Sequence, residues 1–253
     1  MTQTRSAKAA IVTGTSRGLG EAIANLLIQQ GYHVYGIARS APGECLDKEA
    51  EFTNVSCDLA DTAALEGAFD SIAQSLRAQP VEELLLINNA AMLDPLGPLP
   101  DLESAEMAKH LQTSLLAPMV LCSRFIKLVQ NLHIRASIVN VTSGLGEHSA
   151  PSMSMYCSGK AAINMFTRCI ADEQWDAANP VRAYAFDPGM VETAMQVTAR
   201  GQDRTQFPLQ RFFQESHETG KLRLASDVAA ELLRLLELPH QNGSVLRAFE
   251  HSS

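Results

Sequence analysis

Short runs of apolar and β-branched residues alternate with longer amphipathic stretches along this chain. This alternation is typical of βαβ units and predicts a parallel sheet flanked by helices. The apolar runs predict strands at residues 9–13, 33–38, 54–57, 84–88, 137–142, 182–186 and 244–249. The amphipathic stretches predict helices near residues 18–30, 61–78, 102–130, 154–178 and 226–238. Gly31 and Pro80 mark the ends of the first two helices, and Pro118 should kink the helix over residues 102–130.

Residues 188–224 lack this regularity. They begin with Pro188-Gly189 and mix methionine, phenylalanine, arginine and glutamine. They follow the end of a predicted strand, and ligands of α/β sheets bind outside the carboxyl ends of the strands. A plain surface loop would explain the length of the stretch poorly, so we predict a lid over a substrate site. No linker or repeat interrupts the chain, which predicts that residues 1–253 form a single domain.

Composition narrows the range of functions. A net charge of -8 argues against nucleic acid as a partner. Arg200, Arg204 and Arg211 form a small basic cluster that we interpret as a solvated loop. No apolar run reaches the length of about 18 residues that spans a membrane, and residues 1–8 lack the apolar core of a signal peptide.

The cysteines and histidines bear on compartment and metal binding. The five cysteines form no Cys-x-x-C pair, which is typical of reduced thiols in a cytoplasmic protein. Neither the cysteines nor the scattered histidines have the spacing of metal ligands, so no metal site is predicted.

A glycine-rich turn joins the first predicted strand to the first helix. It reads Thr13-Gly14-Thr15-Ser16-Arg17-Gly18-Leu19-Gly20. Glycines at such a turn let the backbone approach a pyrophosphate, whose charge is met by the amide groups and dipole of the helix start. Glycine-rich turns also simply connect strands to helices, but the strand before and the helix after favour a dinucleotide site. Its contacts would come from Gly14, Ser16, Arg17, Gly18, Leu19 and Gly20.

The end of the second strand distinguishes between nicotinamide cofactors. A carboxylate there binds the ribose hydroxyls of NAD, whereas an arginine accommodates the 2′-phosphate of NADP. This chain has Arg39 at that place and no carboxylate before Glu44. Arg17 in the glycine turn would reach the same phosphate. The pattern predicts NADPH, although an exposed arginine without a ligand is the alternative for Arg39.

Tyr156 and Lys160 lie four residues apart in Tyr156-Cys157-Ser158-Gly159-Lys160. A helix brings positions four apart onto one face. A neighbouring ammonium should lower the pKa of the phenol from about 10 and make Tyr156 a usable general acid or base. Ser143 would donate a hydrogen bond to the oxygen of a bound carbonyl. The alternative for the pair is an ordinary helix surface, with Tyr156 half buried and Lys160 in water.

Taken together, these residues resemble the short-chain dehydrogenase/reductase family over nearly the whole chain. The family's motifs recur in order as the glycine turn, Asp58-Leu59, Asn88-Asn89-Ala90-Ala91, Ser143, the Tyr156 and Lys160 pair, and Pro188-Gly189-Met190-Val191-Glu192-Thr193. Each motif alone is weak, but several in order at the family's spacing are specific. The resemblance implies one doubly wound, Rossmann-like domain with strand order 3-2-1-4-5-6-7 and helices on both faces.

The resemblance also assigns roles to individual residues. Asp58 and Leu59 would contact the adenine of the cofactor. Lys160 would bind the nicotinamide ribose as well as tune Tyr156. The remaining cofactor contacts implied are Asn89, Ala90, Tyr156, Pro188, Gly189, Val191 and Thr193, the last two gripping the carboxamide. Family members commonly pair through the helices over 102–130 and 154–178, which implies a homodimer or homotetramer.

Two positions depart from the family's pattern. Ala91 stands where the family usually has glycine, a change that mainly costs backbone freedom. Ser114 stands where the family usually has an asparagine that helps a water relay protons to the lysine. A serine hydroxyl can also hold a water, with a shorter reach, so Ser114 is a fourth candidate catalytic residue.

Within the family, the residues around Tyr156 and Pro188 are similar to sepiapterin reductases, and more closely to bacterial relatives that reduce aromatic diketones such as benzil. The carboxylate that anchors the pterin in sepiapterin reductases has Leu246 or Arg247 at its place. A vicinal dicarbonyl is therefore the better prediction. The expected substrate contacts are apolar, as suits a hydrophobic ketone, and are Leu145, Met153, Met190, Met195, Phe207 and Phe212.

The sequence thus predicts a cytoplasmic, NADPH-dependent carbonyl reductase that acts on a ketone or vicinal diketone. Three alternatives stay open. The chain could be an NADPH-binding sensor or scaffold whose chemistry has decayed, a sepiapterin-type pteridine reductase, or an alcohol dehydrogenase that uses NAD.

Overall fold

The computed structural model describes residues 8–41, 46, 50–130, 132 and 134–249. Glu44 and residues 1–7 lie outside this part of the chain. One sheet of seven parallel strands has the order β3-β2-β1-β4-β5-β6-β7, which confirms the predicted topology. The strands are β1 Lys8–Thr13, β2 Tyr32–Ala38, β3 Phe52–Ser56, β4 Glu83–Asn88, β5 Arg135–Val141, β6 Arg182–Asp187 and β7 Val245–Arg247.

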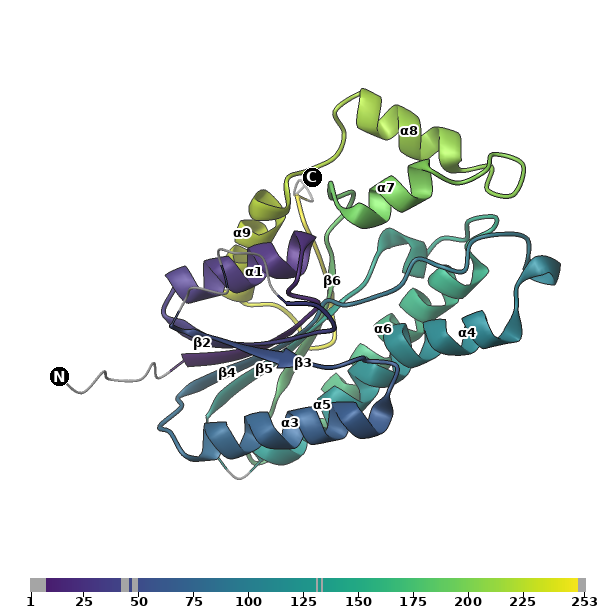
Figure 1. Cartoon of the computed structure of the whole chain (residues 1–253). Coiled ribbons are helices and arrows are strands. Elements are labelled where there is room, and N and C mark those ends of the chain that lie inside the picture. The colour runs from purple at the N-terminus through teal and green to yellow at the C-terminus, as the bar shows by residue number, and fades with distance from the viewer. Residues whose placement is uncertain (1–7, 42–45, 47–49, 131, 133, 250–253) are drawn as a thin grey trace.

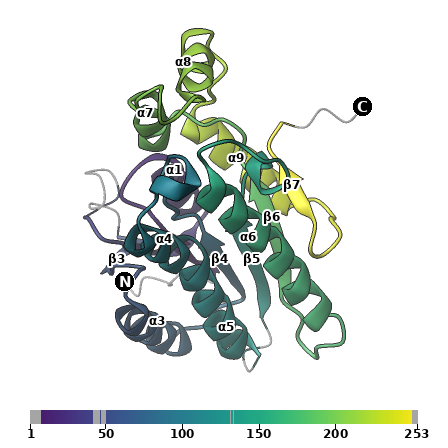
Figure 2. The same ribbon diagram turned by 90° about the vertical axis from the view of Figure 1, so that its right-hand side faces the viewer.

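Helices cover both faces of the sheet, as Figure 1 and Figure 2 show. The helices α1 (Gly18–Gln29) and α9 (Ala225–Leu236) pack on one face. The helices α3 (Thr62–Arg77), α5 (Ala117–Val129) and α6 (Ser154–Glu173) pack on the other. Successive strand residues point to opposite faces, so Ile11 belongs to the core under α3 and α5, and Val12 to the core under α1 and α9.

The predicted helix over residues 102–130 is interrupted. After a 3₁₀ turn at Leu99–Asp101, α4 spans Ser104–Leu111, a π-helical turn spans Gln112–Leu116, and α5 begins at Ala117. Pro118 has no N–H to give to the carbonyl of Ser114, and its ring would clash with that carbonyl in a regular helix. The wider turn relieves the clash. The predicted irregularity at Pro118 is therefore found one turn earlier in the chain.

A buried chain of polar side chains crosses the centre of the molecule. The Asn88 amide on β4 donates to the Asn140 side chain on β5 at 2.8 Å. Asn140 donates in turn to the Thr167 hydroxyl on α6 at 2.9 Å, and Thr167 donates to the carbonyl of Ile163. These bonds fix α6, which carries Tyr156 and Lys160, against the two central strands.

The stretch over residues 188–224 is more regular than its composition indicates. It forms two short helices, α7 (Ala194–Arg200) and α8 (Gln210–Glu218), which stand together beyond the sheet in Figure 1. The sequence interpretation missed both helices, since seven and nine residues are too few to establish a clear period. Arg200 was also misjudged as solvated, because its side chain is only 13% exposed.

The two edges of the sheet are formed by short strands. At one edge β3 is five residues long and mostly exposed, and at the other β7 has three residues. Among the described residues, no helix is both long and apolar enough to cross a membrane.

Candidate active site

A cavity of about 1110 Å³ opens at the carboxyl ends of the central strands. It is lined by the glycine turn after β1, the segments that follow β2 to β6, the start of α6 and residues of both α7 and α8. The predicted contacts that line it are Gly14, Ser16, Arg17, Gly18, Leu19, Arg39, Asp58, Leu59, Asn89, Ala90, Ser143, Tyr156, Lys160, Pro188, Gly189, Val191 and Thr193. Gly20 lies behind the turn and does not line the cavity.

The glycine turn is held close to the segment that follows β4. The Thr13 hydroxyl accepts hydrogen bonds from the backbone N–H groups of Asn89 and Ala90, both at 3.0 Å. Gly14 has φ +75, a conformation that favours glycine. A Cβ on Gly20 would lie 2.2 Å from the carbonyl oxygen of Gly14, so only glycine allows α1 to start this close to β1.

The two arginines expected at the cofactor phosphate both lie at this end of the cavity. Arg17 precedes α1 and Arg39 follows β2, and both are exposed. Neither has an ion-pair partner among the residues that the structure describes. The only carboxylate that lines this end is Asp58 after β3, among the described residues, and its side chain accepts from the N–H of Ala60.

Ser143, Tyr156 and Lys160 meet at the opposite end of the cavity. Ser143 follows β5 and leads into the 3₁₀ turn Gly144–Gly146. A Cβ on Gly146 would lie 3.0 Å from the carbonyl of Lys160, so a glycine there lets α6 pack directly on this turn. The Lys160 ammonium lies 5.6 Å from the centre of the Tyr156 ring and donates to the carbonyl of Val141 at 2.8 Å.

Burial dominates the electrostatics of this cluster. It raises the pKa of Tyr156 to about 12, although the side chain keeps some exposure to the cavity; the hydrogen bond with Ser143 opposes this rise, and the charge of Asp187 adds to it. Burial also lowers the pKa of Lys160 to about 8, against the effect of Asp187. The expectation that the pKa of Tyr156 lies below 10 is therefore wrong for the protein without cofactor, because burial has the larger effect. At neutral pH the phenol is protonated, which is the state that a proton donor needs.

Ser114 is placed differently from its predicted role. It lies in the π-helical turn, is 4% exposed, and does not line the cavity. Its hydroxyl accepts a hydrogen bond from the backbone N–H of Met92 at 2.9 Å, in the cavity-lining segment after β4. The Ser114 side chain therefore contacts the segment after β4 that lines the cavity. Its backbone carbonyl has no N–H donor at position 118, because Pro118 lacks one.

The substrate end of the cavity is largely apolar. Of the six expected contacts, five line it, namely Leu145, Met153, Met190, Met195 and Phe212. Phe207 does not: it is fully buried and stacks on Phe213, with ring centres 5.7 Å apart. The sequence interpretation missed Phe213, which lines the cavity beside Phe212, and also missed Leu93, Thr113, His148, Asp187 and Gln196. No periodic signal in α8 distinguishes Phe213, since its only apolar residues are the adjacent Phe212 and Phe213.

The residues that the structure describes contain no group of histidine, cysteine and carboxylate side chains that could hold a metal ion. The reactive groups that line the cavity include the hydroxyls of Ser143 and Tyr156 and the ammonium of Lys160.

A doubly wound parallel sheet with a glycine turn and a Ser143, Tyr156 and Lys160 cluster is typical of dinucleotide-dependent oxidoreductases. Comparison with known families supports this class. The model of the short chain dehydrogenase family matches residues 8–204. The chain belongs to this family of oxidoreductases, which act on carbonyl and alcohol groups.

Among curated relatives, a benzil reductase ((S)-benzoin forming) of Bacillus cereus is 37% identical over 95% of this chain and 98% of its own length. A sepiapterin reductase of Xenopus tropicalis is 29% identical over 90% of each chain. These similarities confirm the resemblance that the motifs indicate.

Solved structures share the fold. A short chain dehydrogenase/reductase of Saccharomyces cerevisiae superposes with a TM-score of 0.82 at 25% identity, covering 96% of each chain. A 4-hydroxyisoleucine dehydrogenase complexed with NADH and the protein ElxO with NADP bound have TM-scores of 0.79 and 0.74, each covering 95% of this chain and 96% of its own, at 20% and 21% identity. Both cofactors thus occur in proteins of this fold.

Proposed function

We propose that this protein is an NADPH-dependent carbonyl reductase that acts on hydrophobic ketones, and on vicinal diketones in particular. The observation that carries the proposal is the placing of Ser143, Tyr156 and Lys160 in one cavity, opposite a glycine turn flanked by two arginines. Neither arginine has an ion-pair partner among the residues described. The close approach at Gly20 and the exposed guanidinium groups of Arg17 and Arg39 fit a dinucleotide that carries a 2′-phosphate.

Ser143, Tyr156 and Lys160 each have a separate role in the reduction of a carbonyl. NADPH, when bound, supplies the hydride that reaches the carbonyl carbon. Ser143 donates a hydrogen bond to the carbonyl oxygen and orients it. Tyr156, protonated at neutral pH, gives its proton to that oxygen as negative charge develops, so that an alcohol is formed. Lys160 binds the ribose and favours the phenolate that Tyr156 leaves behind.

The lining of the cavity supports the substrate class. Methionine and phenylalanine side chains from α7 and α8 face the end where Tyr156 lies, and methionine adapts to irregular ligands. An apolar pocket with few polar anchors suits an aromatic diketone better than a sugar or an acid. The similarity to a benzil reductase over nearly the full length of both chains supports the same choice.

The test is a screen of NADPH oxidation with diketones such as benzil, quinones, pterins and simple aldehydes, run beside Tyr156→Phe. We expect fastest turnover with a diketone, and a loss of about 10²–10⁴-fold in Tyr156→Phe, the usual worth of general acid catalysis. The NADPH dissociation constant should stay near its normal value, because the ring and its packing remain. A Tyr156→Phe variant with more than about a third of normal turnover would contradict the role of Tyr156. Binding of NADPH without oxidation by any carbonyl would instead favour a sensor.

A further inference from the structure

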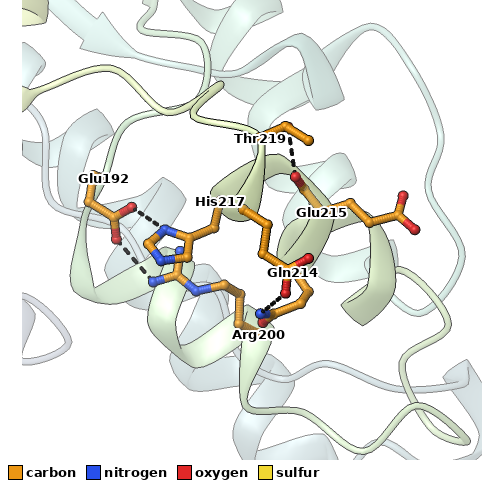
Figure 3. Close-up of polar contacts among 7 residues, drawn as sticks. Glu192, Arg200, Gln214, Glu215, His217 and Thr219 are labelled. Carbon is orange, nitrogen blue, oxygen red and sulfur yellow. Dashed lines mark hydrogen bonds and ion pairs between the residues drawn. The ribbon is translucent and has the colours of Figure 1, made fainter.

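Glu192 connects the cofactor end of the site with α7 and α8, the two helices of the predicted lid over residues 188–224. It lies between Val191 and Thr193, which line the cavity. One oxygen of its carboxylate accepts from the Arg200 guanidinium on α7 at 3.0 Å, and the other lies 3.0 Å from Nδ1 of His217 on α8. Figure 3 shows the carboxylate of Glu192 reaching both side chains at once.

The backbone around Glu192 also forms hydrogen bonds with Arg223, which follows α8 in the chain. The N–H of Glu192 donates to the carbonyl of Arg223 at 2.9 Å, and the N–H of Arg223 donates to the carbonyl of Met190 at 2.9 Å. Val191 and Arg223 pair as an isolated parallel bridge. The segment Met190–Glu192 therefore holds the lid where the chain leaves it and, through the Glu192 side chain, at α7 and α8.

The pair of Glu192 and Arg200 is not an ordinary surface ion pair. The Arg200 side chain is 13% exposed, and the carboxylate of Glu192 is its only acidic partner among the described residues. The hydrogen bond from Arg200 is also the main reason that the pKa of Glu192 lies below its usual range, so the carboxylate is charged at neutral pH. The Glu192 side chain is itself 36% exposed, so the cost of removing Glu192 falls on Arg200, whose largely buried charge would lose this acidic partner.

The two helices that Glu192 joins supply the apolar wall over the substrate end. Met195 on α7 and Phe212 and Phe213 on α8 line the cavity. Beneath them, Phe207 packs with Met153 and Leu93 in a small core of its own. That core includes Ala199 of α7 and Phe213 of α8, and Gln210 on α8 donates to the carbonyl of Arg200 on α7 at 2.6 Å. Glu192 adds a further polar connection, which ties both helices to the segment where the chain enters the lid.

We propose that Glu192 is a positioning residue for the substrate, which holds α7 and α8 as one unit over the apolar end of the cavity. Glu192 itself does not line the cavity. The kinetic part of this inference rests on the proposed function, whereas the structural part does not.

The kinetic experiment compares Glu192→Ala and Glu192→Gln with Glu215→Gln as the matched control. Glu215 is on α8 and pairs with Arg211 of the same helix, so its loss removes an ion pair without separating α7 from α8. We expect KM for benzil to rise about tenfold or more in Glu192→Ala, as for a lost hydrogen bond to a charged group. The rise in Glu192→Gln should be smaller, since one amide oxygen can still accept. The value of kcat and the NADPH dissociation constant should change less than about threefold in both variants.

The second readout needs no turnover. In the cofactor-free protein, amide hydrogen exchange over residues 194–218 should speed up in Glu192→Ala and stay unchanged in Glu215→Gln, while α1 and α9 keep their protection in both. Faster exchange confined to the lid supports the proposal even if no carbonyl is reduced, in which case the proposed function alone fails. Unchanged exchange over the lid, or a fall in kcat with KM unaltered, overturns it.

Discussion

At the level of single residues, the two ends of the cavity differ in how far their cationic side chains are exposed to solvent. At the cofactor end Arg17 and Arg39 are exposed, and neither has an ion-pair partner within the described part of the chain. At the catalytic end Lys160 is 4% exposed, and burial lowers its pKa to about 8. An anionic cofactor bound between the two ends would therefore be attracted by free charge at one end and would favour the charged form of Lys160 at the other.

Arg39 provides a test of cofactor choice. A hydrogen bond to a charged group contributes about 1.5–3 kcal/mol, so Arg39→Ala should weaken NADPH by roughly 10–150-fold. NADH lacks the 2′-phosphate and serves as the control within the same variant, where we expect little change. Fluorescence titrations of both cofactors measure this. Equal loss for NADPH and NADH would show that Arg39 does not contact the phosphate.

Ser114→Ala should affect both stability and turnover. The variant leaves the partly buried N–H of Met92 without its acceptor, and leaving a buried donor unpaired costs about 1–3 kcal/mol, so we expect a loss at the lower end of this range. Turnover should fall as the segment after β4 loosens, with NADPH affinity little changed. Ser71→Ala is the control, because the Ser71 hydroxyl is exposed on α3 and donates only to the carbonyl of Gly67. Urea unfolding measures the change in stability, and initial rates measure the change in turnover. If Ser114→Ala changes neither, Ser114 has no role in positioning the segment after β4.

At the level of elements, the start of α1 depends on close approach rather than on helix propensity. Gly20→Ala would push its methyl group onto the carbonyl of Gly14, a contact of 2.2 Å. We expect a loss of about 1–3 kcal/mol in the free energy of unfolding, as for other overpacked sites, and severely weakened NADPH binding.

Gly67→Ala is the matched control for this substitution. Gly67 lies within α3 and has nothing within 4 Å of the added Cβ. Alanine favours a helix over glycine by up to about 1 kcal/mol, so this variant should be more stable with unchanged cofactor affinity. A stable Gly20→Ala that binds NADPH normally would contradict the close-approach argument.

The sequence predicted the strands and the order of the site motifs because short apolar and β-branched runs and glycine turns leave strong local patterns. It did not predict how the helix over 102–130 divides, since a π-helical turn arises from the conflict between Pro118 and the carbonyl of Ser114 in three dimensions. It also could not tell Phe207 from Phe213. Both belong to the same irregular stretch, and only the packing of α7 on α8 decides which ring faces the cavity.

At the level of the whole molecule, we propose that the protein is a homo-oligomer that pairs through α4, the π-helical turn and α6. Leu111, Leu116 and Met165 on these neighbouring elements are 39%, 42% and 53% exposed. Met165→Glu should shift the protein towards the monomer in light scattering, because a buried carboxylate in an apolar interface is unfavourable. Trp175→Glu is the control, as Trp175 is 83% exposed beyond the end of α6. A monomeric unmodified protein would exclude pairing.

The short edges of the sheet have a consequence for aggregation. An exposed edge strand presents unpaired N–H and C=O groups to which another chain can add. Here one edge, β7, offers only three residues, and the other, β3, is short and has exposed polar positions. Neither edge is a long, flat apolar template for a further strand. The sheet is therefore poorly suited to grow from one molecule into the next, and concentrated solutions of the folded protein should resist β-type fibre formation.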